Sequence, residues 1–237
     1  MDAFDSTREI ETVDGPKPYS ELVPQLALGV EHVMKQIVLR GKDDLRFSFG
    51  RILDLHEEAF KRVVAWAGRV RSKDVQVGNH LPPPHYQVRE LLKQFADDLE
   101  YRVIRLDLDD LDPEEIMRIF AFCEGRFTNI HPFADFNGRV SRLLSWMLVV
   151  RLGLPHTMEI VPPSGNDTMR SELFSALNEY DNHNREPLED IWGRRLLVAM
   201  KTQTDELRRE NERLLVEISR QPAELDAQRA RAENPEN

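Results

Sequence analysis

The 237-residue sequence lacks the features of a disulfide-linked, membrane-bound or secreted protein. Its one cysteine, Cys123, excludes a disulfide within the chain and a cysteine-based zinc cluster. Cys123 stands among apolar residues, which favours a buried side chain over a nucleophile. No apolar stretch approaches the ~20 residues of a membrane-spanning helix. The acidic start MDAFDSTREIETVDG lacks the apolar run of a signal peptide. We therefore expect a cytoplasmic protein that does not enter a membrane.

The sequence also lacks an excess of positive charge. Its 32 lysines and arginines are outnumbered by 42 aspartates and glutamates, which gives a formal net charge of −10. An acidic surface repels phosphate backbones, so no nucleic-acid partner is expected. Net charge describes the whole surface and not one pocket, so a local basic site is still compatible with it. Hydrophobic residues at 41% and charged residues at 31% are typical of a globular domain with appendages.

Apolar residues recur at helical spacing along most of the chain. One pattern, at residues 113–130, follows Asp112 and opens on Pro113, which supplies an N-cap acid and a first-turn proline. Its apolar stripe is wide enough for a central, mostly buried helix. Further helices are expected at residues 21–40, 52–66, 91–99, 140–153, 168–180 and 187–218. The predicted fold class is all-α, a helical bundle.

The composition suggests three parts of the chain. These are an N-terminal extension at residues 1–44, a core domain at 45–200 and a C-terminal part at 201–237. The last part begins as a helix that is charged on most faces, which suits a solvated or partner-bound helix. From about residue 221 the chain is polar and is expected to be disordered.

A short segment interrupts the helical pattern. Residues 74–78 alternate as a strand does, and Asn79-His80 and the proline run 82–84 follow them. Prolines continue neither a helix nor a strand ladder. We therefore expect a small hairpin or flap that stands out from a helical body.

The densest polar cluster is the segment HPFADFNGRVSR at residues 131–142, between the two most apolar expected helices. His131 titrates near neutral pH, so it can take a proton from an attacking hydroxyl. Asp135 offers the hard oxygen ligands that Mg²⁺ prefers. Arg139 and Arg142 are three residues apart, so they share one helix face and can converge on one polyphosphate.

The backbone through Phe136, Asn137 and Gly138 enters a helix, where free N–H groups and the helix dipole favour phosphate. A plainer interpretation stands beside this one. A loop between buried helices often holds a satisfied histidine and a capping aspartate, and arginines often lie on a wet helix face. Spacing alone does not decide between the two.

The segment resembles the signature of the Fic (Fic/Doc) family, in which HPF is followed by any residue, Asp or Glu, Gly, Asn, Gly or Lys, Arg, two residues and Arg. A chance match of this length is very improbable. The matching residues are His131, Pro132, Phe133, Asp135, Asn137, Gly138, Arg139 and Arg142. The likeness extends to the flap VQVGNHLPP, to Trp66-Ala67-Gly68-Arg69 before it and to the stretch from Asp181 to Leu188, so it covers about residues 45–195.

The resemblance implies a Fic-type helical bundle with a β-hairpin flap near the active site. It implies an adenylyltransferase that moves AMP from ATP to a hydroxyl side chain of a target protein and releases pyrophosphate. His131 would be the general base and Asp135 the Mg²⁺ ligand. The phosphate and nucleotide contacts would come from Phe136, Asn137, Gly138, Arg139, Arg142 and Asp181. The flap residues Val75, Val77, Gly78 and His80 would dock the target by strand addition. Self-modification and a homodimer are also compatible with the resemblance.

Phe136 breaks the pattern, because the family usually has glycine at this position. Glycine allows unusual dihedrals and a close approach of the backbone to phosphate. A phenyl ring either hinders the usual nucleotide pose or points away from the turn. Three outcomes therefore stay open: AMP transfer, transfer of another phosphate-containing group, or a weak or silent module that binds a nucleotide or a partner.

Many family members carry an inhibitory helix with Ser or Thr, three residues, Glu, then Gly or Asn. Thr7 to Thr12 resembles its N-terminal version, with Ile10 before Glu11 and threonine in the final position. A competing match in the C-terminal helix ends on Glu206. We expect autoinhibition by Glu11, paired with Arg142; the alternative is that Glu11 is a solvated residue at a frayed end.

Overall fold

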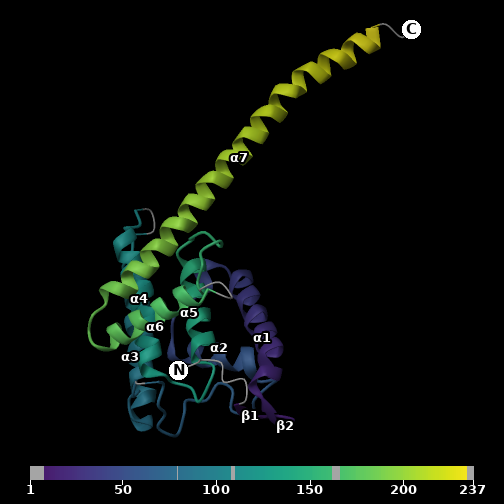
Figure 1. Cartoon of the computed structure of the whole chain (residues 1–237). Helices are drawn as coiled ribbons and strands as arrows, with labels where there is room; N and C mark the ends of the chain where they lie inside the picture. Colours follow the sequence, from purple (N-terminus) through teal and green to yellow (C-terminus); the bar gives the residue numbers. More distant parts are fainter. Residues whose placement is uncertain (1–7, 79, 108–109, 162–165, 234–237) are drawn as a thin grey trace.

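The computed structural model describes residues 8–78, 80–107, 110–161 and 166–233. Seven α-helices and one two-stranded hairpin make up the regular structure of these residues, apart from one 3-10 turn at Lys42–Asp44 (Figure 1). The all-α prediction is confirmed. The helices are α1 (Tyr19–Arg40), α2 (Phe49–Phe60), α3 (His85–Ile104), α4 (Pro113–Ile130), α5 (Asn137–Arg151), α6 (Asp167–Asp181) and α7 (Glu186–Glu233).

Helices α4 and α5 form the centre of the body. Helix α4 begins as its sequence predicts, because the Asp112 side chain accepts a hydrogen bond from the Glu114 N–H at 2.9 Å and Pro113 occupies the first turn. Helix α5 is buried on almost every face. Helices α3 and α7 pack against α4, while α1 packs against α2 and α5 (Figure 1). The loop between α4 and α5 therefore lies at the end of the most buried pair of helices.

The only paired strands among the described residues lie at the N-terminus, where β1 (Glu9–Thr12) pairs antiparallel with β2 (Gly15–Pro18). The predicted inhibitory helix at Glu11 is therefore wrong. Ile10 and Thr12 are buried and their neighbours are exposed, a period of two that suits a strand. Gly15 takes a φ of 99° in the turn, and the Thr12 hydroxyl donates to its carbonyl at 2.6 Å. Glu11 is exposed, and Thr7 lies outside the described residues.

The expected flap hairpin at residues 74–80 is reduced to one tight turn. Val77 and His80 exchange two backbone hydrogen bonds of 3.0 Å, and Gly78 takes a φ of 59° between them. No regular strand forms here within the described part of the chain. The proline run that follows ends any ladder, so the flap stays short.

Helix α7 is longer than expected. Its backbone is helical to Glu233, so the prediction of disorder from residue 221 is wrong for residues 221–233. Residues 234–237 lie outside the described part, as does the loop at residues 162–165. Figure 1 shows α7 leaving the body of the molecule and extending far beyond it.

Across the described residues, no helix has the length and apolar content needed to cross a membrane.

Candidate active site

The loop between α4 and α5 holds two residues in the left-handed backbone region. His131 ends α4 with φ 49° and ψ 62°, and Phe136 precedes α5 with φ 63° and ψ 14°. Side chains disfavour this region, and a bulky one such as phenylalanine is a genuine outlier there. Such strained residues persist where the surroundings hold them, and they cluster at functional sites.

The His131 ring is largely buried, and its Nδ1 atom has no well-aligned hydrogen-bond partner. Burial, followed by the nearby charge of Arg71, lowers the pKa of His131 from 6.5 to about 4. The Thr128 carbonyl opposes this shift and His80 adds to it. The imidazole is therefore neutral at pH 7. Because Nδ1 is enclosed, Nε2 is the nitrogen that can accept a proton from a substrate.

Arg71 holds the loop in place, and the sequence motif gave no signal for it. Its buried guanidinium donates to the carbonyl of His131 at 2.8 Å, of Lys73 at 2.9 Å and of Pro83 at 2.5 Å. Its backbone N–H donates to the Pro132 carbonyl at 2.9 Å. One buried cation thus joins the histidine turn to both ends of the flap segment.

Asn137 and His56 brace the same loop from the other side. The Asn137 side chain donates to the Phe133 carbonyl and accepts from the Phe133 N–H, both at 2.9 Å. Asn137 was predicted to bind phosphate, but its amide is already used, which leaves only its backbone N–H for a ligand. His56 accepts from the Gly68 N–H at 2.9 Å and faces the Asp135 carbonyl at 3.3 Å.

The Phe136 ring turns away from the loop into an aromatic pocket. It is 3% exposed and stacks on Trp66 with ring centroids 5.5 Å apart, and it lies 4.8 Å from the Phe60 ring. Of the two positions that the sequence left open for the ring, the structure shows the one directed away from the turn. The backbone dihedrals that glycine usually supplies are present even though the residue is phenylalanine.

The first two turns of α5 carry the two predicted phosphate-binding arginines. The Arg139 guanidinium lies between the rings of Tyr19 and Phe136, 5.5 and 5.9 Å from their centroids. Arg142 is half-buried, and burial, followed by the charge of Arg139, lowers the pKa of its guanidinium. Buried Glu124 on α4 partly offsets this shift. The two arginines are thus close enough to act on one anion, beside the free N–H groups of a helix N-terminus.

Two residues of the N-terminal hairpin region contact these side chains. Arg8 forms an ion pair with Asp135, with Nη2 and Oδ2 2.8 Å apart. The Tyr19 hydroxyl accepts a hydrogen bond from Arg139 at 2.5 Å, and the Arg8 guanidinium lies over the Tyr19 ring. Among the described residues, no ion pair joins Glu11 to Arg142. The sequence predicted a contact between Glu11 and Arg142, whereas Arg8 and Tyr19 make the observed contacts with the motif.

The flap and the end of α6 meet at the last turn of α4. His80 lies with Nδ1 2.8 Å from Asp181 and Nε2 3.0 Å from the Asn129 carbonyl. The Asn129 amide donates to the other Asp181 oxygen at 2.8 Å. Two predicted site residues, His80 and Asp181, are therefore neighbours, and Asn129 joins them to the turn that holds His131. Val75 is half-buried and Val77 exposed, and no backbone hydrogen bond in the described residues engages Val75 or Gln76.

Asp135 is the one acidic residue of the motif, and its carboxylate suits a single metal contact. One oxygen accepts the Phe136 N–H at 2.7 Å, and the other already holds a cation, the Arg8 guanidinium. Within the described residues no group of three or more metal-ligating side chains gathers. One carboxylate completed by substrate phosphates is the usual arrangement for Mg²⁺, so the residues fit this ion.

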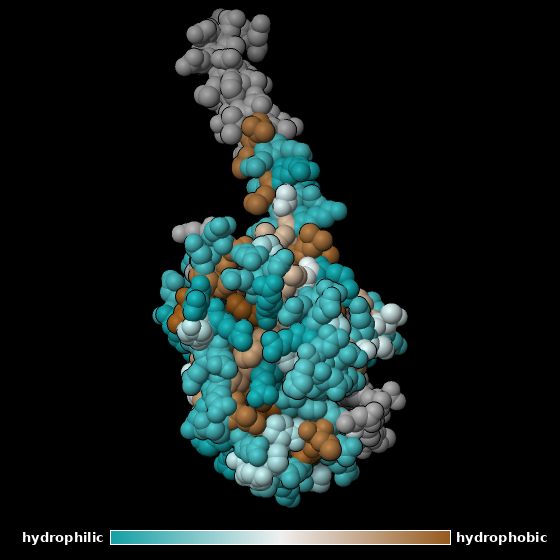
Figure 2. Space-filling view, turned by 90° about the vertical axis from the view of Figure 1, so that its left-hand side faces the viewer, coloured by the Kyte–Doolittle hydropathy of each residue, from teal (hydrophilic) through white to brown (hydrophobic). Residues whose placement is uncertain are grey.

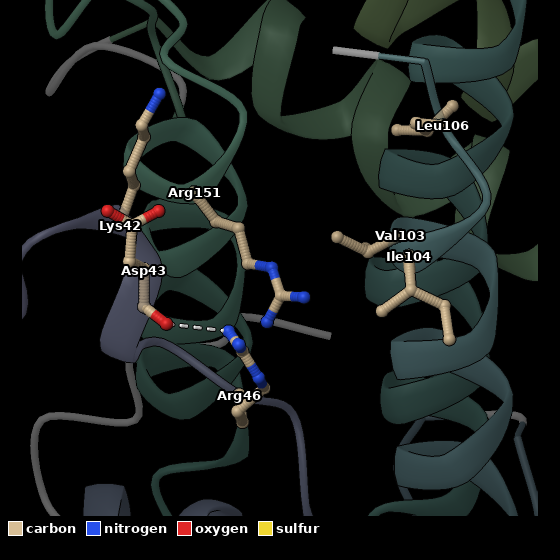
Figure 3. Close-up of a pocket in the computed structure, with 7 residues that line it drawn as sticks. All are labelled: Lys42, Asp43, Arg46, Val103, Ile104, Leu106 and Arg151. Carbon is tan, nitrogen blue, oxygen red and sulfur yellow. Dashed lines mark hydrogen bonds between the residues drawn. The ribbon is translucent and has the colours of Figure 1, made fainter.

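A separate cavity of about 270 Å³ lies at the other end of α5 (Figure 3). Its two arginines, Arg46 and Arg151, are engaged by the Glu100 carboxylate and by backbone carbonyls. Helix α5 has 15 residues, so its two ends are ~22 Å apart. The cavity does not reach the motif, and its two arginines are already paired.

The buried histidines predict a pH dependence of stability. Burial lowers the pKa of His56, like that of His131, from 6.5 to about 4 in the folded chain. Between pH 6.5 and 4 the unfolded chain therefore binds protons that the folded chain does not, and stability falls as pH falls. Each histidine contributes a slope of up to about 1.4 kcal/mol per pH unit. Urea unfolding at pH 7, 6 and 5 measures this slope.

His131→Gln is expected to remove part of this slope, whereas His32→Gln, at an exposed position on α1, is expected to leave it unchanged. Equal slopes in the wild type and both variants would contradict the assignment of a neutral, buried His131.

Fold and site together define a helical protein in which a neutral histidine lies beside a helix N-terminus that carries two arginines. Residues 46–149 match the sequence profile of the Fic/DOC family. This segment of the chain is similar to the Fic/DOC domain. The protein adenylyltransferase Fic of Drosophila willistoni is 34% identical over 157 residues, which are 65% of this chain and 29% of that protein. The protein of the same name from Drosophila mojavensis is 32% identical over 155 residues, with the same coverage. The match thus spans about three tenths of these relatives.

Solved structures share the fold. The BepC protein of Bartonella tribocorum with bound AMPPNP superposes with a TM-score of 0.60 at 17% identity, over 80% of this chain and 92% of that one. Fic-1 (residues 134–508) from C. elegans gives a TM-score of 0.62 at 21% identity, over 77% of this chain and 51% of that one. The prediction of a Fic-type helical bundle is confirmed.

Proposed function

We propose that this protein is an adenylyltransferase that moves AMP from ATP to a hydroxyl side chain of a protein. The observation that carries the proposal is the pairing of a neutral, enclosed His131 with Arg139 and Arg142 at the N-terminus of α5. The names of the curated relatives and the AMPPNP bound by BepC support it. Each residue type suits one part of such a reaction.

His131 takes the proton of the attacking hydroxyl through Nε2 as the new bond to the α-phosphorus forms and pyrophosphate leaves. Arg139 and Arg142 hold the β- and γ-phosphates, and the N–H groups of Asn137 and Gly138 contact the same anion. Gly138 is exposed, and an added Cβ would meet no atom within 4 Å, so there is open space beside this turn for a ligand. Asp181 lies with His80 at the edge of the site.

Mg²⁺ would be held by Asp135 together with the substrate phosphates, and it would neutralise charge that develops on them. The backbone of Val75 and Gln76, which the two hydrogen bonds of the turn at Val77 do not use, would accept a segment of the target protein by strand addition. A hydroxyl of this same chain is a second acceptor, so self-modification is part of the proposal. A cytoplasmic location stays a prediction.

Peptide mass spectrometry after incubation with Mg²⁺-ATP tests the activity. AMP esters on serine, threonine or tyrosine of the chain or of an added target are expected. Peptides that carry phosphate and no AMP would show that the protein transfers phosphate instead of AMP. Unmodified peptides in the wild type and in Arg8→Ala would favour the second candidate, a silent module that binds a nucleotide or a partner.

We propose that the N-terminal hairpin inhibits this site. The Arg8 guanidinium occupies the Asp135 oxygen that Mg²⁺ would use, and Tyr19 holds Arg139 away from a phosphate. The hairpin is itself fixed to the body by buried Ile10 and by the Val13 N–H, which donates to the Val63 carbonyl at 2.9 Å. The inhibitory contact is thus assigned to Arg8 and Tyr19. Glu206 is exposed on α7.

Arg8→Ala is expected to increase the apparent affinity for Mg²⁺-ATP by up to about fivefold. The ion pair is about half exposed on the Arg8 side, and such a pair contributes about 0.2–1 kcal/mol. Titration calorimetry with Mg²⁺-AMPPNP measures the change without turnover. Glu11→Gly, at an exposed position of the same hairpin, is the matched control and is expected to bind as the wild type does. Equal affinities in Arg8→Ala and wild type would refute the inhibitory contact.

A further inference from the structure

Helix α7 continues well beyond the body of the molecule (Figure 1). Its buried residues in contact with the body end at Ala199, and the described side chains from Met200 to Leu215 are exposed or half-exposed. The stretch from Met200 to Glu233 is ~50 Å long at 1.5 Å per residue. In proteins most of the stability of a helix comes from packing one of its faces against a partner surface. This stretch therefore calls for a partner surface along its length.

The side chains along this stretch follow the heptad repeat of a coiled coil, with spacings of three and four residues. We call this row the α7 seam: Leu197, Thr204 and Asn211 at the a positions and Met200, Leu207 and Leu214 at the d positions. Leu197 is 69% exposed and Leu207 is 61% exposed. Figure 2 shows hydrophobic side chains along α7 where it leaves the body. Ile218 continues the spacing in the sequence.

We infer that the α7 seam pairs with the α7 seam of a second copy of this chain, as a parallel, two-stranded coiled coil. Asn211 supports this choice of partner, because a single asparagine at an a position selects two strands in one register. In a self-pair each Asn211 meets an identical amide at the same level. The Thr204 hydroxyl donates to the Met200 carbonyl of its own helix at 2.9 Å, so it is satisfied without the partner.

Charge does not oppose this pairing. In residues 200–215 four basic residues balance four acidic ones, although the whole chain has a net charge of −10. In a parallel pair, Arg208 at position e faces Gln203 at position g of the second copy, and Glu210 at g faces Leu215 at e. No like charges are opposed. A helix of another protein that recognised this stretch by its charge would require an excess of positive or negative residues here. Residues 200–215 have no such excess.

Analytical ultracentrifugation of the full chain tests the inference. The concentrations run from about 1 to 100 µM, so that dimers with dissociation constants in this range are detected. The wild type is expected to approach twice the 27.6 kDa of one chain. Leu207→Glu with Leu214→Glu is expected to stay monomeric, because two charges would be buried in the seam. Both side chains are exposed in the single chain, so the body keeps its fold.

Val198→Glu is the matched control. Val198 is also apolar and exposed on α7, but its b position faces away from the seam, so this variant is expected to dimerise as the wild type does. Asn211→Cys tests orientation, since a parallel register brings the two thiols together and oxidation then links the dimer. Cys123 is buried and does not compete.

A wild-type chain that stays monomeric at 100 µM, or a dimer that persists in the double glutamate variant, would overturn the inference. If the wild type is monomeric, the remaining partner for the α7 seam is a helix of another protein. A dimer that Asn211→Cys cannot link would exclude the parallel register. The outcome does not depend on AMP transfer, because none of these readouts involves a nucleotide.

Discussion

His131→Ala is expected to lower the rate of AMP transfer about 10²–10⁴-fold, the range that a general base contributes. The neutral imidazole is the one group of the motif placed to take the hydroxyl proton, since Asp135 is held by the Phe136 N–H and Arg8. The measurement is the initial rate of label incorporation at saturating ATP, compared with the wild type. A variant that keeps more than about a tenth of the rate would show that another group is the base.

ATP binding separates this effect from damage to the fold. Arg139, Arg142 and the α5 N-terminus are unchanged in His131→Ala, so its affinity for Mg²⁺-AMPPNP is expected to match that of the wild type. The buried Nδ1 atom has no well-aligned hydrogen-bond partner, so removal of the ring costs little hydrogen bonding at that atom. A variant that has lost nucleotide binding as well would mean that His131 is structural.

Phe136→Ala is expected to destabilise the protein by about 3–5 kcal/mol, because a buried ring is lost and a cavity is left. Phe136→Gly removes the same ring but suits a φ of 63°. An L-residue loses about 1–2 kcal/mol in this region. The glycine variant is therefore expected to be about 1 kcal/mol more stable than the alanine variant. Urea unfolding of both proteins measures the difference.

Phe120 provides the control for this reversed order. It is fully buried inside α4 and stacks on Trp192, and its backbone is helical. There the alanine variant is expected to be more stable than the glycine variant by about 1 kcal/mol, the ordinary helix preference. The same order at both positions would contradict the idea that Phe136 stores backbone strain.

Phe136→Gly also tests the choice of donor. The ring points away from the turn, and the backbone already lies in the left-handed region that glycine favours. The variant is therefore expected to keep ATP as its AMP donor. A switch of the transferred group in this variant would support the alternative in which Phe136 selects another phosphate-containing donor.

The helices and the motif were predictable because each has a dense local signal. Asp112 and Pro113 mark the start of α4, and the spacing of its apolar residues marks the buried face. The segment from His131 to Arg142 was recognisable from residue types alone. These features depend on neighbours within a few positions, which a sequence displays directly.

Contacts between distant parts of the chain were not predictable in the same way. Arg71 binds the carbonyl of His131, and nothing in the spacing of an arginine indicates a backbone acceptor. Arg8 and Tyr19 reach the motif only because the hairpin docks against α2 and its following turn. The short match around Glu11 misled, because a six-residue pattern weighs less than the alternation of Ile10 and Thr12 and the turn at Gly15.

The C-terminal helix shows a related limit. Its polar composition suggested disorder beyond residue 221, yet the backbone is helical to Glu233. A helix that is charged on most faces forms when one narrow stripe finds a partner. The partner-bound helix stays a prediction, while the prediction of disorder was wrong for residues 221–233.

The most direct test of the central claim compares ATP labelled at the α-phosphate with ATP labelled at the γ-phosphate. The acceptor is this chain or an added target, and the wild type and Arg8→Ala are both assayed beside His131→Ala. Incorporation of the α label, its loss in His131→Ala and no incorporation of the γ label are expected. Incorporation of the γ label, or of neither label in wild type and Arg8→Ala, would contradict AMP transfer at His131.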